Sequence, residues 1–210
     1  MNSDISKNIP HFSSQVIFSK YDTSGRLSAY LQDILAYNKK VNLVSRETSY
    51  DDLVRIAADC LVPFELIAAP MGKIFDIGAG AGFPSLVLLL GFSGLEGVIF
   101  ERTGKKALFL ESMVRGYDLN AEIISGDFLT VSGDLPSESF DYGFMKYVHL
   151  DKKILSTALL LLKHSGCFIY YSRSDFLSAE MSEGIVVRAL PYYLDDQKQV
   201  HTISIFSTEP

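Results

Sequence analysis

Apolar residues in the first third of the chain recur at helical spacing, and this pattern predicts two amphipathic helices. The first helix carries one buried stripe, formed by Leu27, Leu31, Ile34, Leu35 and Asn38. The second begins near Ser49, where Ser49 and Asp52 form a capping-box pattern, and it should bend or end at Pro63. Together they predict a small helical cap over residues 25–70. The residues before it, 1–24, are expected to form a flexible N-terminal arm.

From residue 71 onward, short β-prone runs alternate with helical segments, a pattern typical of a mostly parallel sheet covered on both faces. Seven strands are predicted, over residues 73–78, 97–101, 121–125, 140–145, 166–172, 184–190 and 200–206. Helices are predicted between them, near residues 82–91, 103–117, 150–163 and 174–182. No helix fits between the last two strands, because "PYYLDDQKQ" contains a proline and a turn-like acidic pair. These two strands should therefore form an antiparallel hairpin.

A parallel sheet that ends in an antiparallel hairpin is the architecture of the class I S-adenosylmethionine methyltransferases. A dinucleotide-binding Rossmann domain instead continues with parallel strands. The predicted fold class is therefore α/β, with a Rossmann-like, mostly parallel seven-stranded sheet over residues 71–210 and an N-terminal helical cap.

Composition and charge narrow the classes of function. The chain has 210 residues, of which 48% are hydrophobic and 21% charged, and no apolar run approaches the length of a membrane span. Cys60 and Cys167 lie far apart without a metal-binding spacing, which favours reduced thiols, a cytoplasmic protein and no metal site. The net charge of −6 argues against a broad electrostatic grip on nucleic acid. The basic cluster at 101–106 allows local phosphate contacts or a solvated helix face.

A glycine-rich turn follows the first predicted strand, at the end of the sheet where open α/β folds bind their ligands. Its segment "DIGAGAGFP" includes Gly78, Ala79, Gly80 and Phe83. The glycines let the chain turn sharply and let a ligand lie against bare backbone. The spacing G-x-G-x-G-F-P differs from the G-x-G-x-x-G of dinucleotide loops. Taken alone, the loop also fits a tight strand-to-helix turn that binds nothing.

Three acids stand at the ends of the first three strands, around this loop. Glu101 can accept hydrogen bonds from both ribose hydroxyls of an adenosyl group. Asp76 suits a ligand that carries an ammonium and a sulfonium, and it would repel a pyrophosphate. Asp127 can accept from an adenine amino group beside the apolar face of Phe128, although a turn role after Gly126 explains it equally well. The set predicts S-adenosylmethionine as the cofactor.

In order and spacing, these motifs resemble the bacterial 16S ribosomal RNA guanine-N7 methyltransferases, also known as glucose-inhibited division protein B. The resemblance runs from about Leu27 to Phe206 and includes "YNKKVNLVS", "DLVRIAADCL", "FDIGAGAGFPSLVL", "FERTGKKALFL" and "FDYGFM". It implies a cytoplasmic enzyme that binds S-adenosylmethionine and methylates a guanine N7 of 16S rRNA, free or in the small ribosomal subunit. We further expect a monomer that needs neither a metal nor a membrane.

The sequence departs from the family pattern on the substrate side. The family's fourth strand ends in S-R-A, with the arginine expected to face substrate, whereas this chain reads Met145, Lys146, Tyr147. The resemblance therefore assigns Lys146 and Tyr147 to the acceptor, as the candidate catalytic residues. Ile56 stands where the family usually has a histidine after Arg55. Two alternatives stay open: a methyltransferase of the same fold with another acceptor, and a non-catalytic cofactor-binding or ribosome-associated module.

Overall fold

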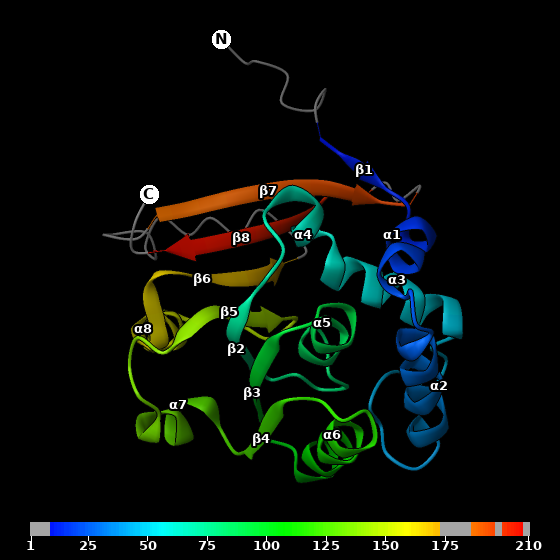
Figure 1. The fold of residues 1–210 in the computed structure, drawn as a ribbon, viewed down its shortest axis with the longest axis horizontal. Coiled ribbons are helices and arrows are strands. Elements are labelled where there is room, and N and C mark those ends of the chain that lie inside the picture. The colour runs from blue at the N-terminus through cyan, green and yellow to red at the C-terminus, as the bar shows by residue number, and fades with distance from the viewer. Residues whose placement is uncertain (1–8, 173–185, 196–198, 208–210) are drawn as a thin grey trace.

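The structure is a computed structural model that describes residues 9–172, 186–195 and 199–207. Its centre is a mixed sheet in the order β1-β7-β8-β6-β5-β2-β3-β4 (Figure 1). The strands are β1 (His11–Phe12), β2 (Gly72–Ile77), β3 (Leu95–Glu101), β4 (Ala121–Ser125), β5 (Phe140–Lys146), β6 (Leu162–Ser172), β7 (Val186–Leu194) and β8 (His201–Ser207). The helices are α1 (Ser14–Tyr21), α2 (Arg26–Asn38), α3 (Tyr50–Leu61), α4 (Pro63–Leu66), α5 (Ser85–Gly91), α6 (Gly104–Gly116), α7 (Phe128–Val131), the short 3-10 helix η2 (Ser132–Asp134) and α8 (Lys152–Leu161).

Strands β4, β3, β2, β5 and β6 run parallel, and β8 then pairs antiparallel with both β6 and β7. The predicted α/β class and the closing hairpin are therefore confirmed. Since β2, β3, β4 and β5 are parallel, their carboxyl ends share one edge of the sheet, and the glycine loop and the acids follow these ends. The helix predicted near 174–182 lies outside the described residues.

The N-terminal segment differs from the prediction of a flexible arm over residues 1–24. In the described part of that segment, β1 pairs parallel with the end of β7 and adds an eighth strand to the seven expected. Helix α1 follows, capped by the Ser13 side chain, and it buries Ile17 and Phe18. Asp195, after β7, accepts a hydrogen bond from the Ser14 backbone N–H at 2.7 Å. These few apolar and capping residues explain why the described residues 9–24 form regular structure, although the polar composition of the segment favoured a flexible arm.

Side chains of the central strands alternate between two hydrophobic layers, one on each face of the sheet. On β2, Ile74 belongs to the layer beneath the cap, α5 and α6, whereas Phe75 and Ile77 belong to the layer beneath α7 and α8. Figure 1 shows these two groups of helices on opposite sides of the sheet. Burial on both faces explains why the strands read as nearly continuous apolar runs.

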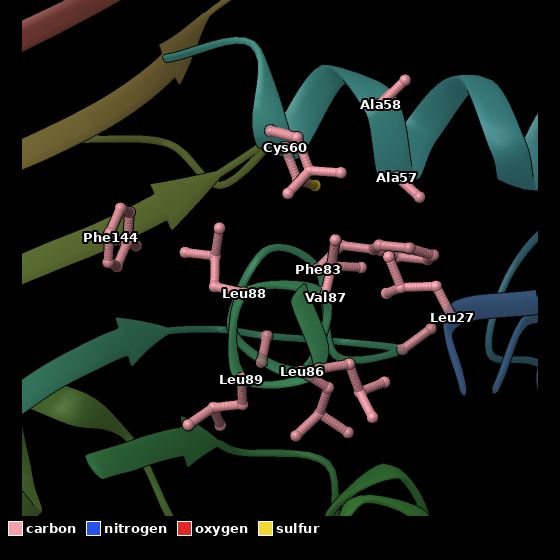
Figure 2. Close-up of a cluster of buried hydrophobic side chains, with 14 of the residues drawn as sticks. Leu27, Ala57, Ala58, Cys60, Phe83, Leu86, Val87, Leu88, Leu89 and Phe144 are labelled. Atoms are coloured by element: carbon pink, nitrogen blue, oxygen red, sulfur yellow. The ribbon is translucent and has the colours of Figure 1, made fainter. Parts of the chain in front are cut away.

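The cap packs directly on the helix that follows the glycine loop. Figure 2 shows Ala57 and Cys60 of α3 facing Val87 and Leu88 of α5, with Leu27 of α2 beside them. All of these side chains are buried. The predicted capping box at the start of α3 is present, and α3 ends at Leu61, just before the proline at 63. The cap therefore fixes the glycine loop from one side.

Candidate active site

The loop after β2 needs glycine at defined points. Gly78 has a φ of +75°, and a Cβ there would lie 2.9 Å from Val148 Cγ2. Its backbone N–H donates to the Phe100 carbonyl at 2.8 Å. Gly82 has a φ of +84°, and a Cβ there would collide with the Tyr30 hydroxyl of the cap. The loop is thus held between β3 and the cap, in a conformation that side chains at these two positions would prevent.

Glu101 ends β3 directly beside this loop. Its Oε2 accepts from the Gly80 backbone N–H at 2.8 Å, and its Oε1 accepts from the Thr103 N–H at 2.7 Å. The side chain is buried, so these two bonds fix the carboxylate between the loop and the start of α6. Each carboxylate oxygen can accept a further hydrogen bond, because it has more than one lone pair.

A cavity of about 530 Å³ opens at this edge of the sheet, and we call it the loop cavity. Its wall is formed by Ile77, Gly78, Gly80, Phe100, Glu101, Arg102, Thr103, Lys106, Gly126, Asp127, Phe128, Leu129, Tyr147, Val148, His149 and Ile154. The structure therefore brings together six of the ten residues predicted for the site: Gly78, Gly80, Glu101, Asp127, Phe128 and Tyr147.

Three residues predicted to touch the cofactor lie behind the loop instead of on the cavity wall. Ala79 and Phe83 are buried in the hydrophobic layer beneath the cap. Asp76 is fully buried, and its Oδ2 accepts from the Ser85 backbone N–H at 3.2 Å, at the start of α5. Their predicted contact with the cofactor stays a prediction, which their position behind the loop does not favour. Strand alternation explains the difference, because Asp76 faces the cap while Ile77 faces the cavity.

The buried Asp76 carboxyl has unusual electrostatics. Burial, together with the nearby charge of Glu101, raises its pKa to about 7 against the opposing effect of the hydrogen bonds from Ser85. Within the described part of the chain, its Oδ1 has no hydrogen-bond partner. Near neutral pH this group therefore exchanges a proton directly behind the glycine loop.

Asp127 and Phe128 occupy the far wall of the loop cavity. The Asp127 side chain accepts from the Leu129 backbone N–H at 3.1 Å and caps the short helix α7. Phe128 packs edge-on against Phe100, with ring centroids 5.0 Å apart, and stacks with Phe75. Asp127 thus performs the turn role that its sequence context allowed, and it still presents its carboxylate to the cavity.

Lys146 does not face the acceptor side, contrary to the prediction. Its side chain is 1% exposed and lines neither this cavity nor the second one described below. It forms an ion pair with Asp59 of α3 and lies between two aromatic rings, 4.3 Å from the Tyr147 centroid and 4.4 Å from the Tyr171 centroid. A buried ammonium needs a counter-charge, and Asp59 of the cap supplies it.

Asp59 is the centre of a buried polar cluster that joins four elements. Its carboxylate contacts Lys146 at the end of β5 and the hydroxyl of Tyr147, the next residue. It also contacts the Tyr192 hydroxyl of β7 and His201 Nδ1 of β8. Burial alone would raise the pKa of Asp59, but the Lys146 charge and these hydrogen bonds outweigh it and hold the pKa well below its usual value. Burial also disfavours the charged form of Lys146, but the nearby charge of Asp59 outweighs this effect and holds the pKa of Lys146 above its usual value. Both groups are therefore ionised at neutral pH.

Tyr147 lies where the cluster meets the surface. Its φ of +57° is uncommon for a residue with a side chain, and 49% of the residue is exposed. Its hydroxyl donates to Asp59 Oδ2 at 3.2 Å, and its ring lies over the Lys146 ammonium. These contacts fix the position of the half-exposed ring, although the backbone of Tyr147 is strained.

Tyr147 also lines a second cavity, of about 300 Å³, between α3 and the hairpin; we call it the cap cavity. It is lined by Asp52, Arg55, Ile56, Asp59, Tyr147, Leu194, Gln199 and His201. Tyr147 belongs to the walls of both cavities. Sequence reasoning singled out only part of this set, because the hairpin residues approach α3 solely through the tertiary fold.

Basic residues lie beside the loop cavity. Arg102 and Lys106 belong to its wall, whereas Lys105 is exposed on α6. His149, which the sequence analysis did not single out, also lines this cavity. Its place after β5, next to Tyr147, was the signal that could have identified it.

Metal sites and membrane spans were searched for over the described ranges. Among these residues no group of three or more His, Cys, Asp and Glu side chains is arranged to hold a metal ion. No helix within them combines the length and apolar character needed to cross a bilayer.

Comparisons with known proteins agree with the motifs. The family model of rRNA small subunit methyltransferase G matches residues 24–189. The ribosomal RNA small subunit methyltransferase G of Borrelia hermsii is 27% identical, and the match covers 75% of each chain. The corresponding methyltransferase G 3 of Bdellovibrio bacteriovorus is 28% identical, over 77% of this chain and 73% of that protein. The resemblance drawn from the sequence is confirmed.

The fold has relatives among solved structures. A SAM-dependent methyltransferase from Aquifex aeolicus superposes with a TM-score of 0.55 at 16% identity, covering 73% of this chain and 91% of that chain. At this level of identity the likeness concerns the fold alone, and it agrees with the predicted class I architecture.

We expect Asp59→Asn to lower the free energy of unfolding by about 3–5 kcal/mol, because it leaves the buried Lys146 ammonium without its counter-charge. Urea denaturation measures this. Asp51→Asn, at an exposed acid on the same helix, is the matched control and should cost less than about 1 kcal/mol. Adding Lys146→Met to Asp59→Asn should restore part of the loss. Equal effects of Asp59→Asn and Asp51→Asn would contradict the cluster's importance.

The raised pKa of Asp76 predicts a pH dependence of stability. Between the usual value of 3.8 and about 7, the folded state holds a proton that the unfolded chain has lost. The contribution of Asp76 to stability should therefore fall by about 1.4 kcal/mol per pH unit across this window and level off above it. The test is the difference in unfolding free energy between the wild type and Asp76→Asn, measured from pH 4.5 to 8. A difference that stays constant with pH would refute the assignment.

Proposed function

Since the chain belongs to the rRNA small subunit methyltransferase G family, we propose that it transfers a methyl group from S-adenosylmethionine to a guanine N7 of 16S ribosomal RNA. The proposal rests most directly on one observation. The Glu101 carboxylate, anchored by the Gly80 and Thr103 backbone N–H groups, faces a cavity at the carboxyl ends of the parallel strands.

The residues of the loop cavity fit S-adenosylmethionine. Its volume of about 530 Å³ lies within the usual range for small-molecule sites. Glu101 would accept from the ribose hydroxyls, and Asp127 from the adenine amino group. Ile77, Phe100 and Phe128 supply apolar surface for the adenine ring. Gly78 and Gly80 leave room for the ligand to lie against the backbone.

Methyl transfer to guanine N7 makes modest demands on the protein. The bound cofactor supplies an electrophilic methyl group, which the N7 lone pair attacks while the electrons of the sulfur–carbon bond stay on sulfur. No proton moves, so a general base is unnecessary. The chain must instead hold N7 in line with the methyl group and exclude water.

Tyr147 suits the acceptor side of this reaction. Its exposed ring belongs to the wall of the loop cavity, where the methyl group would be presented. Methylation leaves a positive charge on the base, and an aromatic face stabilises such a charge electrostatically. In this account Lys146 is a positioning residue, because it acts on Tyr147 from beneath and does not touch the base.

Arg102 and Lys106 would bind RNA phosphates beside the loop cavity. With a net charge of −6 the chain needs such local contacts, because the molecule as a whole repels RNA. The substrate is then 16S rRNA, free or in the small subunit, and the protein works in the cytoplasm as a monomer without a metal. The helical cap, 25–70, and the methyltransferase domain, 71–210, form one functional unit.

One observation favours a second candidate, a methyltransferase of the same fold with a different acceptor. The family's arginine, expected to face substrate, is replaced by Lys146, and this lysine is fully committed to Asp59. An enzyme that has lost this contact would recognise its base in another way. If the purified protein binds S-adenosylhomocysteine but leaves 16S rRNA unmodified, this candidate gains.

Replacing Glu101 by Gln should weaken binding of S-adenosylhomocysteine about 10- to 100-fold, because the amide nitrogen cannot accept from the backbone N–H groups or the ribose. Isothermal titration calorimetry measures this. Glu96→Gln is the matched control, because Glu96 lies on the same strand, half-exposed and paired with Lys73. A Glu101 variant with wild-type affinity would remove the main support for the cofactor site.

The activity itself is tested with small subunits from cells that lack the corresponding methyltransferase. The wild type should transfer a single methyl group to 16S rRNA. Methylation at guanine N7 makes the RNA strand sensitive to cleavage by borohydride and aniline at that nucleotide, which locates the methyl group. Tyr147→Ala should reduce turnover about 100-fold through misplacement of the base, whereas Tyr147→Phe keeps the ring and most of the activity. Failure of the wild type to methylate free rRNA and small subunits would reject the proposed function.

A further inference from the structure

The cap cavity and the loop cavity meet at one side chain. Tyr147 belongs to both walls, and the Asp59–Lys146 pair contacts its hydroxyl and its ring. A molecule in the cap cavity and a molecule in the loop cavity therefore share this residue as a neighbour. Methyl transfer requires two reactants held close together, and Tyr147 is the residue that the two cavities have in common.

We propose that the cap cavity receives the acceptor base itself, a guanine displaced from its RNA stack, against the ring of Tyr147. This inference rests on the proposed function and adds the site that selects the base. It assigns base recognition to α3 and the β7–β8 hairpin, and it leaves phosphate contacts to Arg102 and Lys106.

The size of the cap cavity and the apolar residues in its wall fit a single base. Ile56 of α3 and Leu194 of β7 supply aliphatic surface, and Tyr147 supplies an aromatic face. Its volume, about 300 Å³, accommodates one base and not a second cofactor-sized ligand. Proteins that recognise unpaired RNA bases combine such aromatic stacking with a few polar contacts on the base edge.

The charges around the cap cavity favour a neutral base over a phosphate. Asp52 and Asp59 both have a lowered pKa, the first through hydrogen bonds from Ser49 and the second, despite its burial, through the Lys146 charge and its hydrogen bonds. Asp195 also pairs with Arg55, at 3.2 Å. The carboxylates of Asp52, Asp59 and Asp195 therefore outnumber the two cations paired with them, Arg55 and Lys146, and the remaining negative charge repels an anion.

The same carboxylates also favour guanine over adenine. The two oxygens of Asp59 already contact four side chains, so Asp52 is the acid available to a ligand. Its Oδ2 binds Ser49, while its Oδ1 has a loose ion pair with Arg55 at 3.7 Å. A carboxylate only accepts hydrogen bonds. Guanine offers two adjacent N–H donors, at N1 and N2, whereas adenine offers only its N6 amino group, beside an acceptor at N1.

Because the chain contains no tryptophan, Tyr147→Trp creates a fluorescent reporter at the boundary of the two cavities. With S-adenosylhomocysteine at saturation, guanosine monophosphate should quench this fluorescence in a saturable manner. The apparent affinity for adenosine monophosphate should be at least about tenfold lower, because one charged hydrogen bond is lost. Leu160→Trp, at an exposed position on α8, should respond to neither nucleotide. An equal response to inorganic phosphate, or no response to guanosine monophosphate in a variant that binds S-adenosylhomocysteine, would overturn the inference.

A second variant tests the same site through activity. Ile56→Trp should fill the cap cavity and lower kcat/KM for small subunits about 100-fold, while S-adenosylhomocysteine affinity stays within about twofold of the wild type. Leu160→Trp again serves as the control. If the wild type methylates 16S rRNA and Ile56→Trp does so equally well, the cap cavity is not the base site, although the proposed function stands. A wild type that methylates no rRNA fails the proposed function instead.

Discussion

The buried ion pair between Asp59 and Lys146 is the interaction on which the arrangement of the site depends. It joins the cap to the carboxyl end of β5, and through Tyr192 and His201 it includes the terminal hairpin. Such a pair gains little net stability over apolar side chains, but it is specific, because neither partner can move without leaving a buried charge. The pair thereby determines where the ring of Tyr147 lies. The cap thus contributes to the walls of the cap cavity and also covers α5.

A division of labour follows from this arrangement. The parallel strands bring Glu101, Asp127 and the glycine loop to one edge, where they line the loop cavity that we propose for the nucleoside. The hairpin, added antiparallel at the far side, brings Leu194 and His201 over α3 and forms a second cavity there. Tyr147, which lines both cavities, has a strained backbone conformation with a positive φ. Strain of this kind is kept where the surrounding structure requires it, and it is frequent at functional sites.

The sequence predicted the fold class, the closing hairpin, the capping box of α3 and most of the residues that line the loop cavity on the side of the glycine loop, because these depend on local patterns. Apolar runs, glycine spacing and acids at strand ends are readable without tertiary information. Errors arose where a side chain's direction is decided by packing. Lys146 was assigned to the acceptor, but it lines neither cavity, because its partner Asp59 lies 87 residues away in the chain. Strand alternation turns Asp76 toward the cap, and its contact with the cofactor stays a prediction. The cap cavity could not be foreseen, since its walls come from α3, β5 and the hairpin.

Amide hydrogen exchange with and without S-adenosylhomocysteine tests the central claim most directly, that the edge of β2, β3 and β4 is the cofactor site of a two-cavity enzyme. The account predicts slower exchange in three segments that are distant in sequence, 78–82, 101–103 and 126–129, with the cap cavity segment 52–56 unchanged until guanosine monophosphate is added. Protection that spreads over 52–56 with S-adenosylhomocysteine alone, or that misses the segment containing Gly80 and Glu101, would contradict it.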